Sequence, residues 1–134
     1  MERAVQDFDT AISQQEIFPD AYLNRGTAYL RLRRFGQAIA DYTKVILYDL
    51  ENTEAYLNRG TAHFRQGNLE QSVKDLTDAI TLDPQLGLAY AGRALVLTGL
   101  GRDSEAQQDL ENAVELGIDR AELEPMIEDL KSRR

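Results

Sequence analysis

The chain has 134 residues, which is long enough for one domain with a single core, and its net charge is −8. Its acidic balance disfavours nucleic acid and anionic membranes as partners. It has no cysteine and its one histidine is His63, so disulfides, thiolate chemistry and a transition-metal site are not expected. No apolar run approaches a membrane span, and the polar start MERAVQDF does not resemble a secretory signal. We therefore expect a cytoplasmic protein with no cofactor, no bound metal and no membrane insertion.

The first predicted element is a helix within residues 1–18 that has no partner helix before it. Its apolar stripe comprises Ala4, Val5, Phe8 and Ile12. One side of this stripe can pack on the next helix, and the other side has no cover in this chain. Exposed apolar surface tends to be covered by another molecule, so one hypothesis is a homodimer, or end-to-end packing, through this N-terminal edge.

Beyond this helix the chain follows a 34-residue period. The phrase AYLNRGTA occurs at residues 21–28 and again at residues 55–62, and related residues recur from Ala4 to Leu116. The period divides the chain into units 19–52, 53–86 and 87–118, and residues 1–18 match the second half of a unit. The clearest equivalent positions are Tyr22, Tyr56 and Tyr90; Gly26, Gly60 and Ala94; Ala38, Ser72 and Ala106.

The residue pattern of each unit predicts two helices joined by a short turn. Pro19 and Asp20 suit a helix start, and Gly67 suits a turn between paired helices. Small residues at repeated positions would let the two helices approach closely. Such a pair cannot bury both of its faces alone, so the units must stack. No alternation typical of β-strands is present.

The last predicted element is a capping helix at residues 119–134, where the period is lost. Its apolar residues would cover the last unit, and they are Leu123, Met126, Ile127 and Leu130. One helix, three pairs and one cap give eight helices in all.

The pattern resembles the tetratricopeptide repeat (TPR). The residues that carry the resemblance are Tyr22, Gly26, Tyr29, Ala38, Tyr42 and Val45 in the first unit, Tyr56, Gly60, Gly67, Ala79 and Pro84 in the second, and Tyr90, Gly101, Ala106 and Ala113 in the more divergent third. The resemblance implies an all-α fold, a right-handed superhelical solenoid of antiparallel helix pairs whose first helices line a concave groove. It also implies a role in protein–protein contact.

Two charged series share the period. Arg25, Arg59 and Arg93 form one, and Asp7, Asp41, Asp75 and Asp109 form the other. We favour structural ion pairs, because a partly buried guanidinium needs a carboxylate or carbonyl partner. The alternative is an arginine row for an anionic ligand. The pairs could form within a unit, as Arg25 with Asp41, or between neighbours, as Asp7 with Arg25. We favour the second arrangement, which would help to fix the stacking.

The groove that the resemblance implies defines a candidate peptide-binding surface. Its residues are Leu23, Asn24, Thr27, Leu30, Arg31, Leu57, Asn58, Thr61, Phe64, Arg65, Leu88, Ala91 and Leu95. Asn24 and Asn58 are the centre of the hypothesis, because an amide side chain can pair with both groups of a peptide bond. The alternative is a solvated helix face without a function. In the third unit Gly92 and Gly99 replace Asn and Arg, so the wall there is expected to be apolar.

One subset of the family holds acidic chaperone C-termini through a clamp of basic residues and asparagines. Asn58 matches one clamp position, but Leu23, Thr27, Leu88 and Gly92 stand at the others, so this specificity is not predicted.

No residue supports an enzyme. His63 has no base, nucleophile or oxyanion arrangement beside it and is expected to pack between helices as a neutral ring. The leading hypothesis is an adaptor or scaffold that binds a protein or peptide in its groove. The alternatives are a self-assembling structural module and a TPR domain excised from a larger protein.

Overall fold

In the computed structural model, residues 2–13 and 19–134 form eight α-helices and no strand. The helices are α1 (Glu2–Ser13), α2 (Pro19–Arg31), α3 (Phe35–Tyr48), α4 (Thr53–Gln66), α5 (Leu69–Leu82), α6 (Gly87–Gly99), α7 (Asp103–Glu115) and α8 (Arg120–Ser132). The all-α fold and the three helix pairs predicted from the period are confirmed.

Side chains and glycines set several helix ends. The Asn52 side chain accepts a hydrogen bond from the Ala55 amide at 3.0 Å and begins α4, and Asp119 begins α8 by accepting from the Ala121 amide at 2.9 Å. Gly67 ends α4 with φ of 86°, a left-handed conformation that favours glycine. These local signals place the turns between the paired helices.

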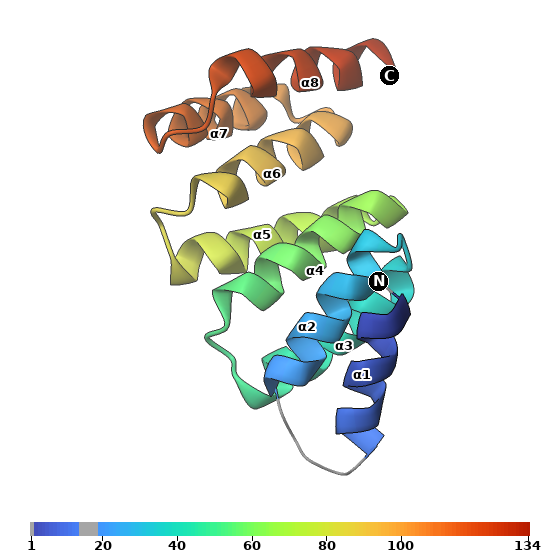
Figure 1. Cartoon of the computed structure of the whole chain (residues 1–134). Helices are drawn as coiled ribbons and strands as arrows, with labels where there is room; N and C mark the ends of the chain where they lie inside the picture. The colour runs from blue at the N-terminus through green and yellow to red at the C-terminus, as the bar shows by residue number, and fades with distance from the viewer. Residues whose placement is uncertain (1, 14–18) are drawn as a thin grey trace.

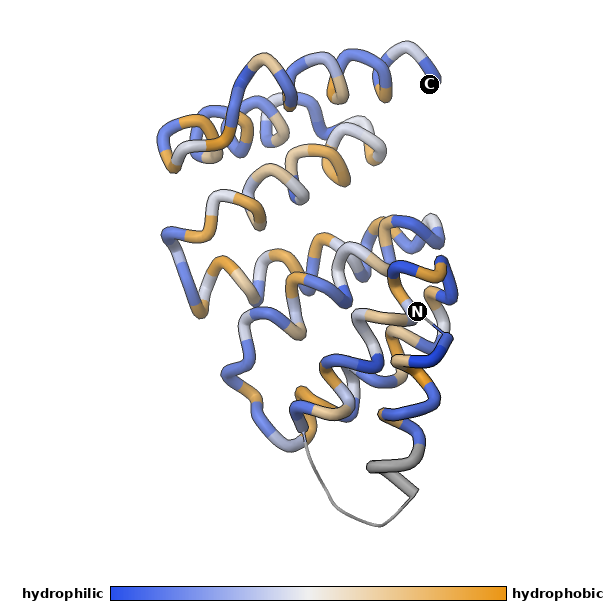
Figure 2. Tube along the Cα trace, in the orientation of Figure 1, coloured by the Kyte–Doolittle hydropathy of each residue, from blue (hydrophilic) through white to orange (hydrophobic). Residues whose placement is uncertain are grey.

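The helix pairs stack in chain order into a solenoid, from the blue N-terminal end to the red C-terminal end (Figure 1). Helices α2 and α3, α4 and α5, and α6 and α7 form antiparallel pairs, α1 packs on α2, and α8 packs on α6 and α7. Apolar stretches recur along the tube with hydrophilic stretches between them, as amphipathic helices require (Figure 2).

The helices of a pair meet where the sequence has its small residues. A Cβ atom added at Gly26 would lie 3.0 Å from the Tyr42 ring, and one at Gly60 would lie 3.0 Å from Leu76. The hydroxyl of Ser72 donates to the Gly60 carbonyl at 2.7 Å across the same contact. The prediction that small residues permit close approach is confirmed.

At the N-terminal end of the stack, the apolar side chains of α1 are less exposed than the sequence predicts. On α1, Val5 is buried against the α2–α3 pair, while Ala4 and Phe8 are half-buried. The side chain of Ile12 lies outside the described residues. Among the described side chains of α1 no large apolar residue is exposed, so the open apolar edge expected there is not present in them.

The capping helix α8 buries one side and presents another. Leu123 and Ile127 are buried against α6 and α7, Leu130 is half-buried and Met126 is 51% exposed. Pro125 lies in the second turn of α8, which continues to Ser132.

Candidate functional site

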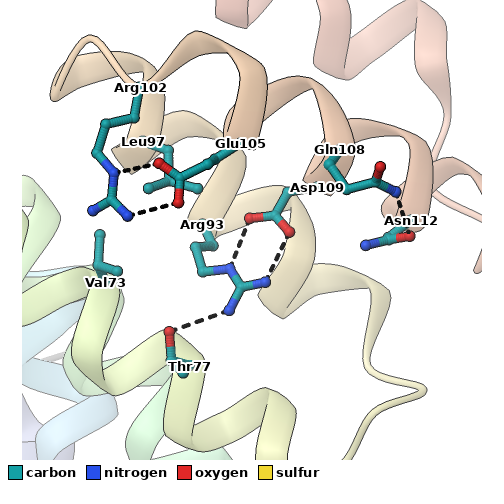
Figure 3. A pocket seen from close by; sticks show the side chains of 9 residues that line it. All are labelled: Val73, Thr77, Arg93, Leu97, Arg102, Glu105, Gln108, Asp109 and Asn112. Carbon is teal, nitrogen blue, oxygen red and sulfur yellow. Dashed lines mark hydrogen bonds and ion pairs between the residues drawn. The ribbon is translucent and has the colours of Figure 1, made fainter.

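Each helix pair contains one ion pair of the same geometry. Nε and Nη2 of Arg59 donate to the two carboxylate oxygens of Asp75, each at 2.8 Å. Arg25 holds Asp41 at 2.8 and 2.6 Å, and Arg93 holds Asp109 at 2.7 and 2.9 Å, as Figure 3 shows for the third pair. The aspartate side chains are only 4% exposed, so these bonds join the helices from inside the pair.

The favoured pairing of each arginine with the preceding unit's aspartate is wrong. Asp7 is exposed and makes no ion pair with any described residue. Close helix approach decides the matter, because a Cβ atom at Gly26 would lie 3.2 Å from the Cβ of Asp41, directly opposite on α3. The arginine nevertheless links neighbouring units through its third nitrogen. Nη1 donates to Asp9 at 2.6 Å, Thr43 at 3.1 Å and Thr77 at 3.2 Å in the three pairs, respectively.

The acceptors of these third bonds were missed in the sequence, although Asp9, Thr43 and Thr77 also share the period. A tyrosine ring lies 5.7–5.9 Å from each guanidinium carbon, at Tyr22, Tyr56 and Tyr90. Hydrogen bonds to Asp75 raise the pKa of Arg59, so its charge is secured. In each of the three arginines, Nε, Nη1 and Nη2 all donate to groups of this chain.

His63 lies beside the second ion pair. Its side chain is 12% exposed, and its Nε2 is 3.9 Å from a carboxylate oxygen of Asp75. Burial lowers its pKa more than Asp75 raises it, so the ring is neutral at neutral pH.

The predicted groove residues lie on α2, α4 and α6, and we call their shared side the groove face. Asn24 is exposed and Asn58 is half-buried, and neither amide makes a side-chain hydrogen bond to the part of the chain that the structure describes. In contrast, the hydroxyls of Thr27 and Thr61 donate to the Leu23 and Leu57 carbonyls at 3.0 Å. The asparagines are therefore the free amide groups of this face, and the threonines are occupied.

Two hollows open on the groove face near its ends. The N-terminal hollow, of about 280 Å³, lies between α1 and α2 and is lined by Ala4, Phe8, Asn24, Thr27, Ala28 and Arg31. The C-terminal hollow, of about 150 Å³, lies between α4, α6 and α8 and is lined by Phe64, Leu95, Met126, Asp129 and Leu130. Arg31 is the charged residue that lines the first hollow, and Asp129 is the charged residue that lines the second.

The remaining groove residues differ in exposure and in the contacts that they make. Arg31 is exposed and has no ion-pair partner among the described residues, whereas Arg65 lies over the Phe35 ring at 5.8 Å. Leu88 on α6 is 59% exposed. Half-buried side chains complete the face at Leu23, Leu30, Leu57, Phe64, Ala91 and Leu95.

A third cavity, of about 300 Å³, lies between α5, α6 and α7 (Figure 3). Arg93 and Asp109 line it, as does Arg102, whose Nε donates to a carboxylate oxygen of Glu105 at 2.6 Å. Its charged side chains are all paired with one another, so it offers a ligand no unpaired charge. No cluster that could hold a metal ion occurs among the described residues.

The fold and this face define a class, the α-helical repeat proteins that stack helix pairs. The sequence model of the tetratricopeptide repeat matches residues 2–44, 23–87 and 57–122, and the chain belongs to that family. This repeat is generally a protein-interaction module rather than an enzyme. No helix of the described residues has the length and apolarity that crossing a membrane requires.

Solved structures agree with this assignment. The second TPR domain of human RPAP3, solved with the HSP70 peptide SGPTIEEVD, is 30% identical, with a TM-score of 0.75 over 85% of this chain and 98% of that one. The TPR2B domain of yeast Sti1, in complex with pHsp70, is 21% identical, with a TM-score of 0.77 over 87% and 98%. MamA shares the fold at 18% identity, with a TM-score of 0.82 over 96% and 83%. Among curated protein sequences, none matches the chain.

Proposed function

We propose that the protein is an adaptor that binds an extended peptide segment of a partner protein along the groove face. The observation that carries the proposal is the pair of free amides at Asn24 and Asn58. They occupy the same position on α2 and α4 and have no hydrogen-bond partner among the described residues. An amide can donate to a peptide carbonyl and accept from a peptide N–H, so two of them can hold a backbone of any sequence.

The RPAP3 domain was solved with a peptide, which supports a peptide ligand for this chain. The acidic sequence of that peptide is not expected here, because Leu23, Thr27, Leu88 and Gly92 provide no cation. Asp20 and Glu54 at the starts of α2 and α4 add negative charge instead.

The alternative of a homodimer through α1 has less support. It depends on an open apolar edge, and the described side chains of α1 that face outward are polar or charged, at Glu2, Arg3, Gln6, Asp7 and Asp9.

The test is selection from a displayed library of random peptides on the whole chain, followed by calorimetry with the selected peptides. The double variant Asn24→Ala, Asn58→Ala is expected to weaken binding by about tenfold or more. The control is Gln37→Ala with Gln71→Ala, because these amides also repeat at the period, are exposed, and lie on the second helices α3 and α5. Equal binding by both double variants would exclude the asparagines as the binding groups.

A further inference from the structure

The C-terminal hollow of the groove face is lined mainly by apolar side chains. Phe64 comes from α4, Leu95 from α6, and Met126 and Leu130 from α8. Met126 is 51% exposed and lines the hollow together with the other three apolar side chains. A large apolar residue left accessible beside three others marks a contact surface.

The size of the hollow limits what can enter it. A volume of about 150 Å³ suits a group of about the size of benzene, which corresponds to one leucine, methionine or phenylalanine side chain. Methionine is flexible, so Met126 can adjust to the shape of the side chain that enters.

Asp129 is the charged residue that lines this hollow. Its carboxylate meets Arg133 at 3.0 Å, but the two side chains are 56% and 71% exposed, so their pair contributes little and can be exchanged. Arg65, on the neighbouring α4, lies over the Phe35 ring on α3 and makes no ion pair with Asp129, so Arg133 is the cation that a ligand would have to displace. A cation from a ligand can therefore replace Arg133 on Asp129.

We infer, on the basis of the proposed function, that the hollow is a specificity subsite for a peptide with a large apolar side chain adjacent to a lysine or arginine. The apolar side chain enters between Phe64, Leu95 and Met126, and the neighbouring cation binds Asp129. The cation Arg31 lies in the hollow at the other end of the face, so the two ends of the groove differ in charge and the peptide has a preferred direction.

The experiment uses the selected peptides, labelled with fluorescein, in anisotropy titrations. They are expected to share a Leu, Ile, Met or Phe next to a Lys or Arg. Met126→Lys is expected to weaken their binding by about tenfold or more, because it places a charge in the apolar hollow. Leu47→Lys is the matched control, since Leu47 is also exposed, at 68%, but lies on α3. Circular dichroism checks that each variant keeps its helicity.

The charge is tested with Asp129→Lys and a paired peptide whose basic residue is replaced by serine. The variant should weaken the basic peptide severalfold more than the serine peptide. Undiminished binding by Met126→Lys, or an equal effect of Asp129→Lys on both peptides, would overturn the subsite. If the asparagine variant still weakens binding, the proposed function survives that result. If no peptide is selected, or neither groove variant weakens binding, both proposals fail.

Discussion

The residues inside the helix pairs are nearly the same in every unit, whereas the residues of the groove face change from unit to unit. Inside, an arginine, an aspartate and a tyrosine recur in all three pairs, and the arginine–aspartate bonds are all 2.6–2.9 Å long. On the groove face, Asn24 and Asn58 give way to Gly92. The free cation Arg31 lies at one end and Asp129 at the other.

The difference separates what the fold requires from what a ligand could use. A buried polar group without its partner destabilises the protein, so the interior has little freedom to vary. The exposed groove side chains, such as Asn24 and Leu88, are accessible, and most substitutions at exposed positions leave the packing intact. The repeated segment AYLNRGTA therefore contains two kinds of residue. Its Arg and Gly contact the second helix of the pair, and its Asn lies on the groove face.

The largest test of the comparison removes an interior arginine. The Asp75 side chain is 4% exposed, and Arg59→Ala removes the two hydrogen bonds that Arg59 donates to its carboxylate. We expect the free energy of unfolding to fall by roughly 3–5 kcal/mol, measured by chemical denaturation. The control Arg102→Ala breaks a pair with Glu105 in which both side chains are about half exposed, and it should leave the free energy of unfolding nearly unchanged. Equal midpoints for the two variants would show that the interior pair is dispensable.

The second test forces the paired helices apart. Gly60→Leu places a side chain where even a Cβ atom would lie 3.0 Å from Leu76 and 3.3 Å from the Cβ of Asp75. Overpacking should lower the free energy of unfolding by roughly 1–3 kcal/mol or more. Gln71→Leu adds apolar bulk at an exposed site on α5 and should be nearly silent in the same denaturation series. A tolerated leucine at Gly60 would mean that the pair is not closely packed there.

The sequence predicted the interior better than the ends. Eight helices and close contact at Gly26 and Gly60 followed from the period and from the small residues. The choice of aspartate did not, because Asp7 and Asp41 belong to one series and the period treats them alike. Only the distance between α2 and α3 distinguishes them.

The C-terminal hollow could not be predicted for a different reason. Met126 and Asp129 lie where the period is lost, so no equivalent residue in another unit indicated that they join Phe64 and Leu95. Leu95 was recognised as a groove residue, but its neighbours on α8 depend on how the capping helix packs against α6.

A smaller test concerns His63, an interior residue whose equivalents in the other units are not histidine. His63 stands where the equivalent residues are Tyr29 and Leu97, and burial lowers its pKa below the usual 6.5. As the pH falls through 6.5, the unfolded chain takes up the proton first, so the free energy of unfolding should decrease modestly. Denaturation midpoints at about pH 7.5 and about pH 5.5 should differ less in His63→Leu than in the native chain. The same pH dependence in both proteins would assign it to other groups.

The smallest expected change in stability comes from extending the groove pattern into the third unit. Gly92 lies in the interior of α6, and a Cβ atom there would meet Leu76 at 3.4 Å, an ordinary contact. Gly92→Asn should therefore raise the free energy of unfolding by a few tenths of a kcal/mol through helix propensity, and Gly92→Ala by up to about 1 kcal/mol. Only the asparagine adds a third amide in line with Asn24 and Asn58, so only that variant should bind longer selected peptides more tightly. The alanine variant controls for helix propensity, because it stabilises α6 without offering a hydrogen bond. If calorimetry gave the same affinity for both variants, the amide row would not extend its hold on the peptide to α6, and the apolar hollow would be the ligand-contacting feature of that half of the groove.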